Sequence, residues 1–239
     1  GEVPQNPYGE ELQFLRTTIA QTNPYSEVVI QAAENGTNLA TYPENNPLAN
    51  ALRNVALLIA GGLQTKVYVV SLGGFDTHAN QVIEGEPLSG EHAELLLQLS
   101  EAVASFQEDL AMLGLNDRVL GMTFSEFGRR IKSNDSLGTD HGTAAPLMFF
   151  GECVNPNVLG DNPEIPEEVS NNEGVPMQFE FRNVYGSVLM DWLRVDEADI
   201  RSLLHPEFKY LPVLANCNPE TTTQREAFYF QIETQCFPN

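Results

Sequence analysis

The stretch KVYVVSLGGFDTH, which runs from Lys66 to His78, indicates the fold class of this chain. Residues 66–72 are mostly apolar and β-branched, a pattern typical of a short strand that is buried on both faces. The strand leads directly into a glycine-flanked loop that carries Asp76 and His78. Because α/β proteins keep their functional groups at strand ends, this stretch predicts a buried sheet with a site at its edge.

A long helix and a second strand follow this loop. The helix is indicated by apolar residues at intervals of three and four, namely Leu96, Leu99, Val103, Phe106, Leu110 and Leu113. The second strand is predicted from Arg118 to Phe124. A strand, a helix and a strand of these lengths form a βαβ crossover. We therefore expect an at least partly parallel sheet, with the loops after both strands at one edge.

The other expected elements rest on the same kinds of pattern. We expect helices over residues 9–34, 47–63 and 183–195. We expect one further strand over residues 145–150. Residues 152–180 are rich in Asn, Pro and Glu and are expected to form a surface loop.

Two carboxylate–imidazole pairs suggest a metal site. In extended backbone, the spacing of Asp76 and His78 puts both side chains on one side of the chain. Asp140 and His141 lie on a second glycine-flanked loop. The alternatives are that Asp76 only caps a turn, and that Asp140 orients an imidazole instead of binding the ion. Because two such loops rarely coincide by accident, we expect these four residues to be metal ligands.

A third polar motif, Ser125–Arg129, follows the second strand. Glu126 could act as a ligand or a general base, and Arg129 could bind an oxyanion through two hydrogen bonds. A Glu–Arg ion pair that holds the loop is the alternative interpretation. The other two histidines, His92 and His205, are expected to be structural.

The composition limits the partners. The chain of 239 residues has a net charge of −21, from 33 acidic and 12 basic residues. Such a surface repels nucleic acid and anionic membranes, so we exclude both, and the chain contains no apolar run long enough to span a bilayer. The acidity fits a secreted protein.

The cysteines and the first residues bear on processing. A disulfide between Cys217 and Cys236 would close the polar C-terminal segment, and Cys153 would then be the remaining cysteine. The alternative is that Cys217 and Cys236 are both free thiols. The chain begins Gly-Glu-Val-Pro, without an initiator Met or a signal peptide, which suggests a processed or truncated product.

Four ordered motifs resemble the DUF1501 family. They are GGFDTHANQ (residues 73–81), HAELL (92–96), TFSEFGRR (123–130) and GTDHGTAAP (138–146). The resemblance covers roughly residues 8–212. Members are bacterial proteins that are commonly exported through a twin-arginine signal. The resemblance therefore implies a secreted or periplasmic protein, without naming a reaction.

A more distant resemblance, to the alkaline phosphatase/sulfatase superfamily, implies a chemistry. Those enzymes hydrolyse phosphate or sulfate esters at two-metal sites. By resemblance, Asp76, His78 and His141 would bind the first divalent ion, with zinc the first choice and manganese or calcium the alternatives. Phe127 replaces a histidine of the second site, which leaves Glu126 and Asp140 as its carboxylates. Arg129 would bind the ester oxygens.

The same resemblance implies the architecture. We expect a mostly parallel sheet flanked by helices, alkaline-phosphatase-like, without its N-terminal strands, because the superfamily's nucleophile lies upstream of the first motif. Residues 1–212 would be the C-terminal portion of that domain, and residues 213–239 a tail closed by the disulfide. The sheet would then expose an edge and an apolar face. We expect the missing N-terminal segment or another subunit to cover them, within an extracellular assembly.

Two functions follow from these expectations. The first is an exported metal-dependent hydrolase of phosphate or sulfate esters, or the C-terminal part of one. The alternative is a non-catalytic extracellular structural or binding protein that retains the hydrolase fold. The two differ in whether the Asp and His side chains converge on an ion.

Overall fold

The computed structural model describes residues 3–4, 6–215 and 226–232, without the side chains of residues 19–23 and 226–232. Helices and strands are mixed along the chain, which gives a mixed α/β protein. In chain order the elements are α1 (Pro7–Asn35), α2 (Pro47–Ala60), β1 (Val67–Ser71), α3 (Glu91–Met112), the 3₁₀ turn η1 (Asn116–Arg118), β2 (Val119–Ser125), β3 (Gly128–Ser133), β4 (Thr139–Gly142), β5 (Phe149–Phe150), α4 (Phe181–Asp191), α5 (Glu197–Leu203) and β6 (Glu226–Ile232).

The described strands form one four-stranded sheet, in the order β1-β6-β2-β5, and a separate hairpin of β3 and β4. β6 pairs in parallel with both β1 and β2, whereas β2–β5 and β3–β4 are antiparallel. β1 and β2 therefore run in the same direction, and the loops that follow them leave the sheet at the same edge. This edge carries the candidate site.

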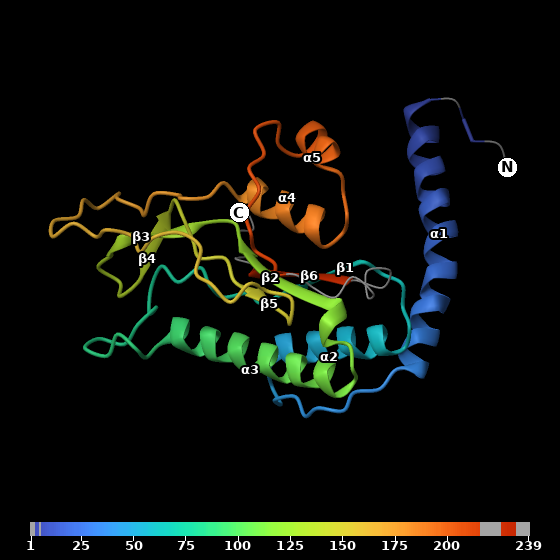
Figure 1. Ribbon diagram of the computed structural model, residues 1–239, viewed down its shortest axis with the longest axis horizontal. Helices are drawn as coiled ribbons and strands as arrows, with labels where there is room; N and C mark the ends of the chain where they lie inside the picture. The colour runs from blue at the N-terminus through green and yellow to red at the C-terminus, as the bar shows by residue number, and fades with distance from the viewer. Residues whose placement is uncertain (1–2, 5, 216–225, 233–239) are drawn as a thin grey trace.

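Helices cover both faces of the sheet (Figure 1). On one face, α2 and α3 bury a large apolar cluster that includes Leu52, Phe106 and Val119. On the other face, α4 contributes Val188, and Trp192 at its end packs near Leu120. Val119 and Leu120 are neighbours in β2 and belong to different clusters, because successive side chains of a strand point to opposite faces.

A buried carboxylate ties the segment after α1 to α3. Asp109 is fully buried in α3 and accepts hydrogen bonds from the backbone nitrogens of Leu39 and Ala40, at 2.6 and 3.0 Å, and from the side chains of Asn38 and Tyr42, at 2.7 and 2.9 Å. These four donors replace the water that the carboxylate loses on burial. Burial would raise the pKa of Asp109, but these hydrogen bonds outweigh it and lower the pKa below the ordinary value.

The structure confirms the long helices and the first two strands, and corrects other expectations. Some of the described strands pair in parallel and others antiparallel, so the prediction of a mostly parallel sheet is wrong for the residues that the structure describes. β1 and β2 are separated by β6, which comes from the segment expected to be a tail. The predicted third strand is shortened to β5 and is antiparallel to β2.

Two other differences concern exposure and local structure. β1 was expected to be buried on both faces, but Val67 and Val69 are 43% and 57% exposed. They lie on the face of β1 opposite Tyr68, which packs in the α2–α3 cluster. The expected loop around Asp140 and His141 is strand β4, because it pairs with the residues that follow Phe127.

Cys153, expected to be left over, is disulfide-bonded. The two cysteines expected to pair with each other, Cys217 and Cys236, lie outside the described residues. None of the helices in the described ranges combines the length and the hydrophobicity that a membrane span requires.

Candidate metal centre

The candidate site lies where the loop after β1 meets the β3–β4 hairpin. Several hydrogen bonds join these segments. Among them, the backbone nitrogen of Thr139 donates to the Thr77 carbonyl at 3.3 Å, that of Asn80 to the Ser136 carbonyl at 3.0 Å, and the Asn134 side chain to the His78 carbonyl at 2.8 Å. Segments some sixty residues apart in sequence are thus fixed side by side.

Close packing at Gly138 allows this contact. A Cβ atom built on Gly138 would lie 2.3 Å from the carbonyl carbon and oxygen of His78, closer than real side chains approach. The Asn134 side chain accepts from the Gly138 nitrogen at 3.1 Å, which completes the turn of the hairpin. Glycine is therefore required here so that the hairpin can reach the loop.

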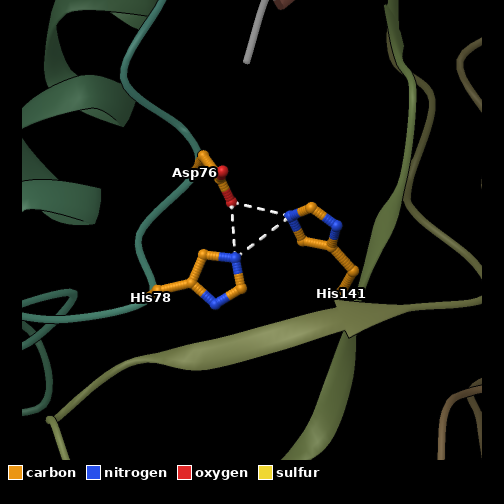
Figure 2. A group of neighbouring side chains, drawn as sticks. All are labelled: Asp76, His78 and His141. Atoms are coloured by element: carbon orange, nitrogen blue, oxygen red, sulfur yellow. Dashed lines mark hydrogen bonds and ion pairs between the residues drawn. The ribbon is translucent and has the colours of Figure 1, made fainter. Parts of the chain in front are cut away.

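Asp76, His78 and His141 converge on one point (Figure 2). The Nε2 atoms of His141 and His78 lie 2.7 and 3.1 Å from Oδ1 of Asp76. The two Nε2 atoms lie 3.2 Å from each other. Within the part of the chain that the structure describes, these residues form the one group of three or more ligand-type side chains that could hold a metal ion.

The triangle has the size that a small divalent ion needs. Ligands about 2.0–2.1 Å from a tetrahedral zinc ion lie about 3.3 Å from one another. The three observed separations, 2.7, 3.1 and 3.2 Å, require movements of a few tenths of an ångström to match it. Two imidazoles and one carboxylate are a ligand set that zinc commonly takes. The residues present therefore fit a divalent ion.

The site is partly open to solvent. The side chains of Asp76, His78 and His141 are 26%, 47% and 38% exposed. Three protein ligands leave at least one coordination position of a zinc ion for water or a substrate, as in catalytic zinc sites.

Arg129 holds Asp76 in place. Its Nη2 lies 3.1 Å from Oδ1 of Asp76 and also donates to the Phe75 carbonyl, and its Nη1 donates to the Thr139 carbonyl at 2.5 Å. The guanidinium therefore joins the loop to the hairpin. Burial would raise the pKa of Asp76, but the hydrogen bond from His141 and the positive charge of Arg129 lower the pKa below the ordinary value.

Asp140 lies beside the triad and does not join it. Its Oδ1 lies 3.0 Å from Nδ1 of His78, the ring nitrogen that faces away from Asp76, and its Oδ2 lies 3.2 Å from Nη1 of Arg130. The hydrogen bonds from His78 and Asn134 lower the pKa of the Asp140 carboxyl. This geometry matches the alternative in which Asp140 orients an imidazole.

Phe127 covers one face of His141. The two rings are stacked, with centroids 3.5 Å apart and an angle of 19° between their planes. The guanidinium carbon of Arg129 lies 4.9 Å from the centroid of the Phe127 ring. The stack fixes the plane of the His141 imidazole and covers one side of the ring.

The other candidate residues lie outside this cluster. Glu126 is exposed in the turn between β2 and β3 and is not a member of the group that converges on the metal position. The Ser125 hydroxyl donates to the Phe127 carbonyl at 2.9 Å. His92 contacts Phe75 edge-on, and His205 lies 3.4 Å from a Glu180 oxygen.

Sequence reasoning missed the residues that join the two segments. Gln81 accepts from the hydroxyls of Thr77 and Thr139, at 3.0 and 2.7 Å, and Asn134 bonds across the junction. The run Asn134-Asp135-Ser136 is a turn signal that could have indicated a hairpin. Spacing alone could not show which loop the turn would meet.

Comparison with known proteins gives one match. A family model described as "Protein of unknown function (DUF1501)" matches residues 20–190. No curated protein and no solved structure matches the chain.

Proposed function

The chain belongs to the DUF1501 family, and on that premise we propose that it is an exported metal-dependent hydrolase of phosphate or sulfate esters. The observation that carries the proposal is the convergence of ligand atoms from Asp76, His78 and His141 on one partly exposed point. A structural site in which all ligands come from the protein would be closed, whereas this arrangement leaves room for a reacting group.

A divalent ion bound there would polarise an ester oxygen and lower the pKa of a coordinated water. The protein's own groups set up the site for it. Arg129 fixes the Asp76 carboxylate, and the Phe127 ring fixes the plane of His141. Preorganised ligands of this kind bind an ion without first having to be ordered.

We propose that the site takes a single ion, zinc before manganese or calcium. The Phe127 ring occupies one face of His141, and the Arg129 guanidinium lies against Asp76. A second cation near Asp76 would therefore meet an apolar ring and a fixed positive charge, both of which oppose it. Glu126 and Asp140, the carboxylates considered for a second site, do not belong to the converging group.

The wider architecture and the compartment belong to the same proposal. We propose that the sheet formed by β1, β6 and β2, with the helices that cover it, belongs to an alkaline-phosphatase-like domain in a secreted or periplasmic bacterial protein. The parallel β1–β6–β2 portion of the sheet and the position of the site at its edge support this. The exposed side of β1, with Val67 and Val69, is the surface that a further segment or subunit would cover.

Hydrolysis of model esters tests the proposal. The chain would be loaded with zinc, manganese or calcium and assayed with p-nitrophenyl phosphate and p-nitrophenyl sulfate. We expect turnover that is lost in His78→Gln and His141→Gln and kept in His205→Gln, which changes a histidine outside the site. Turnover that is equal in all three variants would refute a role for this site.

The same geometry also supports a second function, a non-catalytic binding or structural protein that keeps the site. The observation that favours it concerns Arg129, whose guanidinium donates to the Phe75 and Thr139 carbonyls as well as to Asp76. A guanidinium used in this way braces the protein instead of binding ester oxygens. Metal binding without hydrolysis of either ester would favour this second function.

A further inference from the structure

The two ring nitrogens of His78 face different environments. Nδ1 lies 3.0 Å from Oδ1 of Asp140, whereas Nε2 lies among the ligand atoms of the triad, 3.1 Å from Asp76 and 3.2 Å from Nε2 of His141. A histidine that binds a metal needs a lone pair on the nitrogen that faces the ion. The position of the ring proton therefore decides whether His78 can be a ligand.

Asp140 is itself held in place by two other side chains. Its Oδ2 lies 3.2 Å from Nη1 of Arg130, and its Oδ1 is 3.4 Å from the side-chain nitrogen of Asn134. Arg130 also donates from Nε to the His141 carbonyl at 3.2 Å. The carboxylate is thus fixed to both strands of the hairpin and cannot turn away from His78 without breaking these bonds.

The contact between Nδ1 of His78 and Asp140 is a hydrogen bond, and a carboxylate can only accept, so this contact requires a proton on Nδ1. The Asp76 oxygen near Nε2 of His78 accepts instead from Nε2 of His141, at 2.7 Å, and so does not require a proton on Nε2 of His78. A neutral imidazole carries one proton, and a proton on Nδ1 leaves a lone pair on Nε2. That lone pair points at the position where the triad would hold an ion.

We propose that Asp140 is a positioning residue that keeps the proton of His78 on Nδ1 and so keeps Nε2 ready to bind a metal. The part of this inference that concerns metal affinity rests on the proposed function, whereas the part that concerns the proton does not. Asp140 acts through His78 and does not touch the ion. Outer carboxylates of this kind typically contribute 10–100-fold to metal affinity.

The first test needs no metal. Long-range ¹H–¹⁵N NMR spectra of the metal-free protein at pH 8, where an ordinary imidazole is neutral, report which nitrogen of His78 carries the proton. We expect Nδ1–H in the wild type and in Asp135→Ala, which removes an equal charge from an exposed residue of the same hairpin. In Asp140→Ala we expect a mixture of the two tautomers. A wild-type ring protonated on Nε2, alone or together with Nδ1, would overturn the inference.

The second test measures zinc affinity by competition with a chromophoric chelator. We expect Asp140→Ala to bind zinc 10–100-fold more weakly than the wild type. Asp140→Asn, which keeps the shape and one accepting oxygen, should restore part of that loss and guards against a folding defect. Equal affinity in the wild type and Asp140→Ala would overturn the inference. A wild type that binds no zinc would instead refute the proposed function, and the NMR result would still decide the position of the proton.

Discussion

The Nε2 atoms of His78 and His141 lie 3.2 Å apart, although the two residues are separated by 63 positions in the sequence. Both atoms also face the same carboxylate oxygen of Asp76. Two ring nitrogens and a carboxylate oxygen at these distances are arranged like three ligand atoms around one metal ion. The contact between the loop after β1 and the β3–β4 hairpin brings them together.

Replacing Gly138 should separate the two halves of the site. In Gly138→Ala the new Cβ would meet the His78 carbonyl at 2.3 Å, so the loop or the hairpin must move. We expect a loss of roughly 1–3 kcal/mol in the free energy of unfolding and at least about a tenfold loss of zinc affinity, measured by urea unfolding and chelator competition.

Gly114→Ala is the matched control. Gly114 has a φ of +69° and nothing within 4 Å of its Cβ position, so its replacement should cost roughly 1 kcal/mol of backbone strain and leave zinc affinity unchanged. Equal zinc affinity in Gly138→Ala and the wild type would show that the close approach does not position His78.

Arg129→Lys should weaken the junction although it keeps the charge. Lysine lacks the planar fork with which Arg129 reaches Asp76 and two carbonyls. We expect urea unfolding to show a loss of roughly 2 kcal/mol. Arg201 pairs with Glu197 and donates to the Pro206 carbonyl at an exposed site, so Arg201→Lys loses the same kinds of contact in water and should cost less, about 1 kcal/mol or below. Similar losses in both variants would contradict the bracing role.

Asp109→Asn should make stability less dependent on pH in the acid range. The folded-state pKa of Asp109 lies below its unfolded value, so the charged side chain stabilises the fold fully above the unfolded pKa, which is about 3.9. That contribution is lost as the pH falls through the folded-state pKa. At pH 7, we expect Asp109→Asn to lower the free energy of unfolding by about 3 kcal/mol. The amide of Asn carries N–H groups, and one or two of them would face the N–H and O–H groups that donate to the Asp109 carboxylate.

Urea unfolding between pH 7 and pH 3 checks this prediction. The difference between the wild type and Asp109→Asn should shrink as the pH falls below about 4. Asp161→Asn, at an exposed loop position, provides the control and should follow the wild type. A constant difference across this range would show that the charge of Asp109 is not the source of the stabilisation.

The exposed face of β1 predicts association. Val67 and Val69 lie on an edge strand and are largely exposed, and such faces are commonly covered by another segment or subunit. Light scattering coupled to size exclusion should show the isolated chain as an oligomer, and Val69→Lys should shift it toward the monomer. A folded, monodisperse wild-type monomer would contradict this prediction.

Hydrophobic periodicity predicted most of the fold. The spacing of Leu99, Phe106 and Leu110 located α3, and the β-branched run located β1, because both patterns reflect burial against neighbouring elements. The order of the strands could not be predicted in this way. β6 inserts between β1 and β2, and pairing between distant strands leaves no local pattern. The aromatic run EAFYFQI of β6 is itself a strand signal, but it lies in a C-terminal segment expected to be a polar tail.

The candidate site was predicted in part. The sequence placed Asp76, His78 and His141 on two loops, and the structure brings them together. It did not separate Asp140 from them, because neighbours such as Asp140 and His141 look equivalent until a strand directs their side chains apart. The partners of Arg129 are mainly carbonyl oxygens, which every residue has, so no motif could reveal them.

Zinc content tests the central claim most directly. The wild type, His78→Gln, His141→Gln and His205→Gln would be equilibrated against the same buffered free zinc and analysed by inductively coupled plasma mass spectrometry. We predict about one equivalent in the wild type and in His205→Gln, and a large loss in the other two variants. A wild type without zinc, or the same zinc content in all four proteins, would contradict the proposal that Asp76, His78 and His141 form a metal centre.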